Sequence, residues 1–241
     1  FGELAGDRVR VYSVELFGAK APTGEELALA EVSLLTPCQP GKLLGLWNNF
    51  HERAAVEKLT RPEHPLYFVK TDNCYLAGDQ DIRRPAGYDG PVVFEGELGV
   101  VIGSECRNVA EDDAERHIFG YTCVNDVTAR TILRSDPSFP QWVRAKSFDT
   151  FGVFGPVIAT GLDPATLHIR TVLNGQERQN YPAADMFFPP AKLVSLISQD
   201  LTFEPGDVIC CGTSVGVGSM KPGSDVAVSI EGIGELANRF E

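Results

Sequence analysis

Most apolar residues of this chain lie in short runs, and glycine and proline residues separate these runs. Alternating apolar and polar positions, or brief continuous stretches rich in Val and Ile, are typical of β-strands. Gly and Pro set the backbone of the turns between strands. The pattern therefore predicts a mainly β protein, with strands at 8–16, 66–70, 92–102, 119–124, 157–160, 168–173, 208–211 and 226–230.

Three segments show helical spacing instead. Residues 43–59 place apolar side chains at helical intervals, with Asn48 or Asn49 as the candidate N-cap. Residues 111–119 begin with three acidic residues, which suit the positive end of a helix. Residues 189–201 carry a proline near the first turn and an apolar stripe after it. Residues 130–146 predict a long loop, and the expected fold class is α+β, mainly β.

The composition limits the partners that this chain can bind. Lys and Arg number 21 against 33 Asp and Glu, which gives a formal net charge of −12, and no basic run stands out. Nucleic acid and anionic membranes attract clustered cations, so we expect neither as a partner. No apolar run approaches the ~20 residues that a membrane-spanning helix needs, and we expect a soluble protein.

The cysteines indicate the compartment. Six of them are scattered along the chain without a CxxC pair, and no basic and apolar leader precedes the first strand. This usage fits reduced thiols in the cytoplasm. Because residue 1 is Phe rather than Met, a targeting segment that preceded it would not be visible in this sequence.

The run VVFEGELGVVIG at 92–103 contains two glutamates inside an otherwise apolar strand. Side chains alternate along a strand, so Glu95 and Glu97 share one face and are neighbours. Like charges repel, and each buried carboxylate is costly unless a cation compensates it. The pair therefore either lies on the solvated face of an antiparallel strand or binds a cation.

Asp126 is the best candidate for a third oxygen ligand. It ends the apolar run in GYTCVNDVTAR, where a turn could direct its carboxylate toward a neighbouring strand. Ligands that are all oxygen favour Mg²⁺, Mn²⁺ or Ca²⁺ over zinc. With three carboxylates, Mg²⁺ would keep coordination positions for water or for substrate oxygens.

Seven motifs occur in the order and approximate spacing of the fumarylacetoacetate hydrolase family. They read FEGELGVVIG (94–103), GYTCVNDVTAR (120–130), WVRAKSFDTF (142–151), FGPVI (154–158), LNGQ (173–176), LTFEPGDVICCGTSVGVG (201–218) and VSIEGIGEL (228–236). The chain resembles this family over roughly residues 37–240, and the motifs are highly specific as a set.

The resemblance implies a fold, a metal and an assembly. The fold would be the mixed β-sandwich or roll of the family's C-terminal domain, at residues 41–241, with a mobile lid near 45–60. A small β segment at 1–40 would precede it. In this family the two glutamates and the aspartate hold a divalent metal, which assigns Mg²⁺ or Mn²⁺ to Glu95, Glu97 and Asp126. The family generally forms homodimers.

The resemblance also implies substrate contacts. Lys146 corresponds to a family lysine near the substrate's carbonyl or carboxylate oxygens, where an ammonium could stabilise negative charge. Thr213 occurs where the family uses a Gly-Thr turn to contact substrate oxygens. Apart from the resemblance, side-chain chemistry makes Lys70 and Arg130 candidates for binding a substrate carboxylate, and an arginine offers a planar fork for this. Either could equally be an ordinary ion-pair partner.

The acid/base pair departs from the family pattern. Hydrolases of the family use a His and a Glu near an NYxxHA motif, whereas this chain reads NFHERA, with Arg53 at the histidine position. His51 and Glu52 stand nearby as candidates. Adjacent residues of a helix do not face each other, so this dyad requires a locally non-helical segment or a closing lid. The alternative is a surface His-Glu on the first turn of a helix.

The expected substrate is a small anionic 2-oxo acid. With His51 as the base, the expected reaction is hydrolytic C–C cleavage of an acylpyruvate or fumarylpyruvate type substrate. Without a competent base, the same site favours decarboxylation or isomerisation of 2-oxo-ene-dioates such as 2-hydroxyhepta-2,4-diene-1,7-dioate, or of oxaloacetate. A β-rich binding module is a further alternative. Residues 212–216 match GxSxG, but no histidine follows that serine, which disfavours a serine hydrolase.

Overall fold

The computed structural model of this protein describes residues 1–13 and 15–241. Within these residues the strands form four sheets and the helices are short, which confirms the mainly β, α+β class. The central sheet is mixed and has seven strands. In spatial order they are β5 (Leu66–Lys70), β4 (Leu43–Trp47), β15 (Val208–Cys210), β9 (Gly96–Ile102), β10 (Ile118–Asp126), β12 (Gly152–Ala159) and β6 (Tyr75–Leu76).

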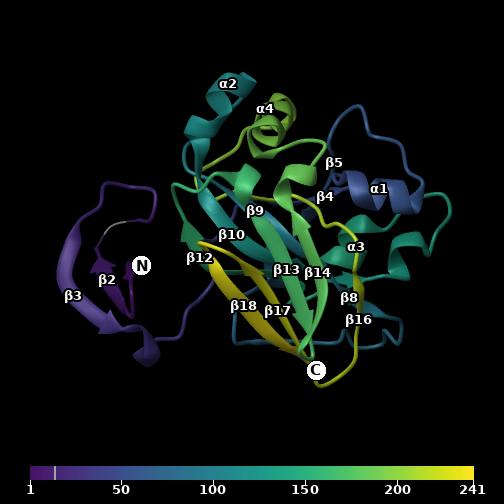
Figure 1. The fold of residues 1–241 in the computed structure, drawn as a ribbon, viewed down its shortest axis with the longest axis horizontal. Helices are drawn as coiled ribbons and strands as arrows, with labels where there is room; N and C mark the ends of the chain where they lie inside the picture. Colours follow the sequence, from purple (N-terminus) through teal and green to yellow (C-terminus); the bar gives the residue numbers. More distant parts are fainter. Residues whose placement is uncertain (14) are drawn as a thin grey trace.

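A five-stranded sheet packs on one face of the central sheet (Figure 1). In spatial order it contains β14 (Gln176–Pro182), β13 (His168–Leu173), β17 (Ser224–Ile230), β18 (Gly234–Phe240) and β7 (Asp81–Ile82). Buried and more exposed residues alternate along β13 and β17, whereas every residue of β9 is buried. The five-stranded sheet therefore has one solvent-exposed face, and the core lies between the two sheets.

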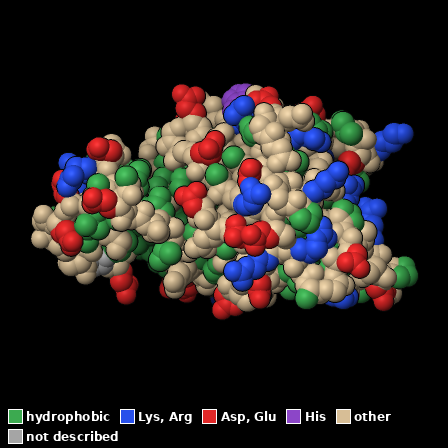
Figure 2. Space-filling model, turned by 90° about the horizontal axis from the view of Figure 1, so that it is seen from below, with side chains coloured by type: hydrophobic (Ala, Val, Ile, Leu, Met, Phe, Trp, Pro, Cys, Tyr) green, Lys and Arg blue, Asp and Glu red, His purple; other side chains and the backbone are tan. Residues whose placement is uncertain are grey.

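Two smaller sheets complete the strands. One contains β11 (Thr128–Ala129), β8 (Val92–Phe94) and β16 (Gly218–Met220), in that spatial order. The other contains β1 (Gly2–Ala5), β2 (Arg8–Tyr12) and β3 (Pro22–Ala28), and it lies at the end of the molecule away from the first and third α-helices (Figure 1). Acidic and basic side chains are interspersed over the face shown in Figure 2.

The helices lie at the edges of the sheets. They are α1 (His51–Glu57), α2 (Glu111–Ala114), α3 (Trp142–Lys146) and α4 (Pro190–Asp200), with 3-10 turns at Leu29–Glu31, Asp72–Cys74, Glu115–His117, Ile132–Arg134, Pro164–Thr166 and Ala183–Asp185. Pro190 opens α4, as predicted, and the apolar stripe of that helix is buried. None of the described helices has the length and apolar character that crossing a bilayer requires.

The predicted helix at 43–59 is wrong in its first part. Residues 43–47 form β4, which pairs with β5 on one side and β15 on the other. A continuous apolar run fits a buried strand as well as a helix, and here the partners lie far away in the sequence. The helix begins only at His51, and the side chain of Asn49 bonds to the backbone of Phe188 and Cys211 instead of capping it.

The remaining strand predictions differ mostly at their ends. The predictions at 66–70 and 168–173 coincide with β5 and β13. The predicted strand at 92–102 is interrupted at Glu95, where the chain passes from the sheet of β8 into the central sheet. The predicted strand at 8–16 ends at Tyr12, and its residue 14 lies outside the described residues. The predicted loop at 130–146 contains α3, which forms against β5.

Candidate metal centre and active site

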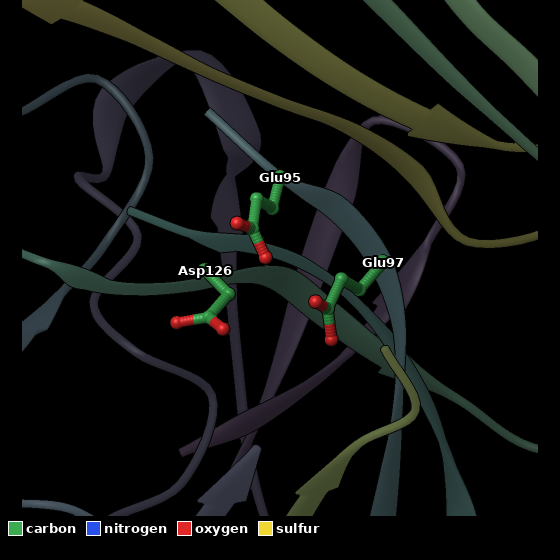
Figure 3. Close-up of side chains that lie close together, drawn as sticks. All are labelled: Glu95, Glu97 and Asp126. Carbon is green, nitrogen blue, oxygen red and sulfur yellow. The ribbon is translucent and has the colours of Figure 1, made fainter. Parts of the chain in front are cut away.

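Three carboxylates meet at the end of the central sheet. Glu95 precedes β9, Glu97 lies within it, and Asp126 is the last residue of β10. The antiparallel pairing of β9 with β10 brings them together, and the Asp126 N–H donates to the Glu95 carbonyl at 2.8 Å. One oxygen of each carboxylate lies within 4.8 Å of the others, and Figure 3 shows the three groups converging. The three carboxylates that the sequence predicts to be neighbours therefore lie close together.

Two buried lysines form ion pairs with this cluster. Lys146, at the end of α3, donates to Glu95 at 3.0 Å and to Asp126 at 2.5 Å. Lys70, at the end of β5, donates to the other oxygen of Asp126 at 2.6 Å and to the Lys146 carbonyl. Two ammonium groups therefore face three carboxylates, which leaves one negative charge for a further cation if all are ionised.

The pKa values follow from these contacts. Burial, and then the nearby Asp126 and Glu95, raise the pKa of Glu97 well above its usual value. Burial alone would also raise the pKa of Asp126, but Lys146 and Lys70 outweigh it and lower that pKa. For Lys146, burial is outweighed by the three carboxylates, which raise its pKa and keep it charged. Glu97 is thus the ligand that most lacks a cation.

The donor set fits a hard divalent cation. Glu97 accepts from the Gly212 N–H at 2.8 Å through one oxygen, while its other oxygen is buried and has no hydrogen-bond partner among the described residues. Buried polar atoms without partners are rare and costly. A cation held by Glu95, Glu97 and Asp126 would supply the missing partner, and three carboxylates are the ligands that Mg²⁺, Mn²⁺ and Ca²⁺ prefer.

The peptide between the two glutamates is held by side chains from other segments. The Gly96 N–H donates to Gln179 Oε1 at 3.0 Å, and its carbonyl accepts from Thr213 at 2.8 Å and from Tyr181. Gln179 also donates to Thr213 at 2.8 Å, and all of these side chains are buried. The network therefore fixes the backbone from which both glutamates project.

A cavity of about 1100 Å³ opens beside the carboxylates. Glu95 and Thr128 line it on the side of the cluster. An aromatic wall forms another side, where Phe68 and Trp142 stack with their ring centroids 5.2 Å apart and Trp47 packs at 5.8 Å from Trp142. Three arginines also line the cavity: Arg53, Arg130 and Arg134. A flat anionic ligand suits this lining.

Helix α1 presents Arg53 rather than His51 to the cavity. Among the described residues, the lining includes Arg53 and Glu57 of this helix but neither His51 nor Glu52. His51 is exposed, and its ring packs against Phe187 at 4.1 Å between centroids. Residues two positions apart in a helix are about 200° apart around its axis, so the side chains of His51 and Arg53 point to opposite sides.

The other predicted substrate residues lie in different settings. Arg130 lines the cavity with its side chain exposed, as a carboxylate-binding residue should. Thr213 is buried and its hydroxyl donates to the carbonyl of Gly96, so it supports the peptide between Glu95 and Glu97. Lys70 is buried against Asp126 and lies outside the cavity lining, which places it behind the carboxylates. Their substrate contacts stay predictions.

Gln179, Tyr181 and the aromatic wall were not predicted from the sequence. Gln179 and Tyr181 are spaced two apart in β14 and therefore share one face of that strand, which is a usable signal. Trp47, Phe68 and Trp142 come from three separate elements, so only the tertiary structure brings them together.

Family models match nearly the whole chain. The model described as "Fumarylacetoacetate (FAA) hydrolase C-terminal" matches residues 42–241, which include the carboxylates, both lysines and all residues of the cavity. A model described as "Rv2993c-like, N-terminal" matches residues 1–37, the part that holds the first three strands.

Several curated proteins are similar in sequence. An uncharacterised protein of Archaeoglobus fulgidus is 42% identical over 89% of this chain and 84% of its own length. The 4-hydroxyphenylacetate degradation bifunctional isomerase/decarboxylase of Escherichia coli is 35% identical over 98% of this chain and 55% of its own length. The oxaloacetate tautomerase YisK of Bacillus subtilis is 32% identical over 92% of this chain and 79% of its own.

Solved structures show the same fold. A 2-hydroxyhepta-2,4-diene-1,7-dioate isomerase from Mycobacterium marinum superposes with a TM-score of 0.88 at 38% identity, over 97% of this chain and 87% of that one. A maleylpyruvate hydrolase from Sphingobium sp. SYK-6, solved with manganese(II) and pyruvate, has a TM-score of 0.76 at 30% identity, over 90% of this chain and 76% of that one. These matches confirm the fold and the resemblance seen in the sequence: the chain belongs to the fumarylacetoacetate hydrolase family.

Proposed function

We propose that this protein is a divalent-metal-dependent enzyme that isomerises or decarboxylates 2-oxo acids by way of their enolates. The observation that carries the proposal is the set of side chains at and beside the cavity: Glu95 lines it, Glu97, Asp126 and the buried Lys146 cluster with Glu95, and α1 adds an arginine instead of a histidine. This favours decarboxylation or isomerisation over the hydrolysis first expected, because hydrolysis needs a base that activates water.

Glu95, Glu97 and Asp126 would hold the metal, for which we propose Mg²⁺ or Mn²⁺. When bound there, the ion supplies Lewis-acid polarisation of the carboxylate and 2-oxo oxygens of the substrate. The buried Glu97 oxygen without a partner supports this assignment. The manganese in the maleylpyruvate hydrolase structure supports it from a relative.

The chain's own residues stabilise the enolate. Lys146 stays protonated because the carboxylates around it raise its pKa, so it can hold negative charge that develops on the 2-oxo oxygen. Arg130 binds carboxylate at the cavity wall, and the aromatic wall keeps water from the conjugated chain of the substrate. Loss of CO₂ and loss of a proton both leave electrons on the same oxygen, so one site serves both reactions.

Relatives with named activities support this choice. The names printed for two of them are an isomerase/decarboxylase and an oxaloacetate tautomerase. The structural match at 38% identity is a dioate isomerase. The maleylpyruvate hydrolase keeps hydrolysis as the second candidate, and it is the outcome that the assay must distinguish.

The test offers three substrates to the purified protein with Mg²⁺ or Mn²⁺: oxaloacetate, acetylpyruvate and 2-hydroxyhepta-2,4-diene-1,7-dioate. We expect enol–keto conversion or CO₂ release, which ultraviolet absorbance and NMR monitor. We expect no acetate from acetylpyruvate. Lys146→Met should remove the activity. Lys42→Met is the control, since Lys42 forms its own ion pair with Asp207 at 2.7 Å outside the cavity lining. Acetate as the dominant product would establish hydrolysis instead.

A further inference from the structure

Arg53 occupies a place in the cavity for which the proposed reaction has no use so far. It lies in the middle of α1 and lines the cavity together with Glu57. Burial would lower its pKa, but Glu95, Glu57 and Glu97 outweigh burial and raise it, so the guanidinium stays charged beside the metal ligands.

The Arg53 guanidinium is hydrogen-bonded at Nε and can form further hydrogen bonds at its terminal nitrogens. Its Nε donates to Glu57 at 2.9 Å, and Nη1 lies 3.5 Å from the Thr213 carbonyl. Among the described residues, no other partner contacts its terminal nitrogens. An arginine whose Nε is already occupied can still donate to a carboxylate end-on, through one N–H of each terminal nitrogen.

Arg53 is also close to where the substrate must bind. Thr213, whose carbonyl it approaches, donates its hydroxyl to the carbonyl of Gly96, the residue between the two metal-binding glutamates. A carboxylate on Arg53 is therefore separated from the metal ligands by a short distance, which a small molecule can span.

The charges of the cavity lining call for a second anion. Among the described residues, the lining has three arginines and only two acids, Glu57 and Glu95. Glu95 belongs to the metal cluster, and Glu57 pairs with Arg53 along one edge only. A 2-oxo monocarboxylate would place its single carboxylate at the metal end and leave Arg53 facing an uncharged part of the ligand. Arg130 and Arg134 are exposed, whereas the Arg53 side chain is only 20% exposed, so Arg53 is the arginine that a second anion would stabilise most.

We propose that Arg53 binds a second carboxylate of the substrate, so that the enzyme selects short 2-oxo dicarboxylates over 2-oxo monocarboxylates. Glu57 is a positioning residue for it, since it fixes Nε and thereby aims the open end of the guanidinium into the cavity. This inference rests on the proposed function, because it assumes that the 2-oxo carboxylate end occupies the metal.

Two inert ligands test the inference by binding rather than by turnover. Oxamate and N-oxalylglycine both offer an oxalyl group for chelation, and only N-oxalylglycine adds a second carboxylate. Their dissociation constants are measured by calorimetry on the protein saturated with Mn²⁺. We expect the wild type to bind N-oxalylglycine more tightly. Arg53→Met should weaken N-oxalylglycine binding about 30-fold and change oxamate binding by less than about threefold, since removing one partner of a desolvated charge pair has an effect of this order.

Three further variants make the result specific. Arg53→Lys keeps the charge without the fork and should retain part of the preference. Glu57→Gln should weaken N-oxalylglycine binding to a smaller degree than Arg53→Met. Arg61→Met is the matched control, because Arg61 is an exposed arginine close to α1 that packs on Phe187 and Phe188 outside the cavity lining. Manganese binding by each variant, followed by electron paramagnetic resonance, confirms that the site is loaded.

Different results would contradict the proposed function and the inference about Arg53. If neither ligand bound the loaded wild type, the proposed function would be wrong, and the inference with it. If oxamate bound as tightly as N-oxalylglycine, or if Arg53→Met weakened both ligands alike, only the inference would be overturned. The second pattern would mean that Arg53 merely balances the charge of the metal ligands.

Discussion

The substitution Gly96→Ala tests whether the hydrogen bonds around Gly96 fix the positions of Glu95 and Glu97. A Cβ atom at this position would lie 2.0 Å from Thr171 Oγ1 and 3.2 Å from Gln179 Oε1. Both neighbours are buried and hydrogen-bonded to each other at 3.0 Å, so neither can move without losing a bond. The new methyl group therefore has to displace the peptide from which Glu95 and Glu97 project.

The magnitude follows from two contributions. Overpacking of a well-packed core costs about 1–3 kcal/mol. Breaking the bond from the Gly96 N–H to Gln179 leaves a buried donor without a partner, which costs about 1–3 kcal/mol. We expect Gly96→Ala to lower the free energy of unfolding by about 3 kcal/mol, a loss that a domain with about 5–15 kcal/mol of stability can survive. Manganese affinity should fall at least about tenfold, which corresponds to ~1.4 kcal/mol.

A double-mutant cycle with Thr171→Ala isolates the cause. This second substitution removes the atom at 2.0 Å and leaves Thr171 Cβ at 3.3 Å from the new methyl group. Urea unfolding and manganese titration of the four proteins should show a favourable coupling of about 1–2 kcal/mol, because the two atoms compete for one place. Gly18→Ala is the control, since among the described residues its Cβ would meet only the Glu15 carbonyl, at 3.4 Å. Strict additivity, or an unchanged metal affinity in Gly96→Ala, would refute the reasoning.

Three other predictions concern the charged groups. Because the pKa of Glu97 is raised in the metal-free fold, the stability that this group contributes is present below its unfolded pKa of about 4.3 and is lost as pH rises through the folded pKa. Urea unfolding of the metal-free proteins should therefore show that wild type loses free energy of unfolding relative to Glu97→Gln as pH rises. Saturating Mg²⁺ should reverse this pH dependence. Parallel curves of unfolding free energy against pH for the two proteins would contradict the prediction. His51→Ala should change turnover of the best substrate by less than about twofold, because this side chain is exposed and outside the cavity lining; a loss beyond tenfold would return His51 to the mechanism. Lys146→Met should lower kcat at least about 100-fold and destabilise the metal-free protein by about 3–5 kcal/mol, since it leaves Glu95 and Asp126 without this cation; steady-state kinetics and urea unfolding measure both, and an unchanged kcat would remove Lys146 from the chemistry.

The three carboxylates could be predicted from the sequence as neighbours because the rule that places them is local. Alternation along one strand puts Glu95 and Glu97 on the same side, and the end of an apolar run marks Asp126. The structure retains this arrangement even though the strand is interrupted at Glu95. Lys146 could be proposed from its motif, and Lys70 only as a candidate for a substrate carboxylate or an ion pair. Their separate contacts could not be predicted, because these depend on which oxygen of Asp126 each ammonium approaches.

The error at 43–59 shows where local patterns stop being sufficient. The apolar run at the start of this segment has helical spacing, yet it is a strand, because its hydrogen-bond partners lie in β5 and β15. Because residues 43–47 form a strand, the helix begins only at His51. Pairing between distant segments is decided by the whole fold and overrides a short periodicity.

By itself, the sequence determined the fold class, the family and the three carboxylates that lie close together. It did so because strand alternation, turn residues and motif order are properties of neighbouring residues. Only the tertiary structure decided which side chain of α1 faces those carboxylates. A helix turns about 100° per residue, so the docking of α1 against the cavity selects Arg53 and turns His51, two residues earlier, to the outside.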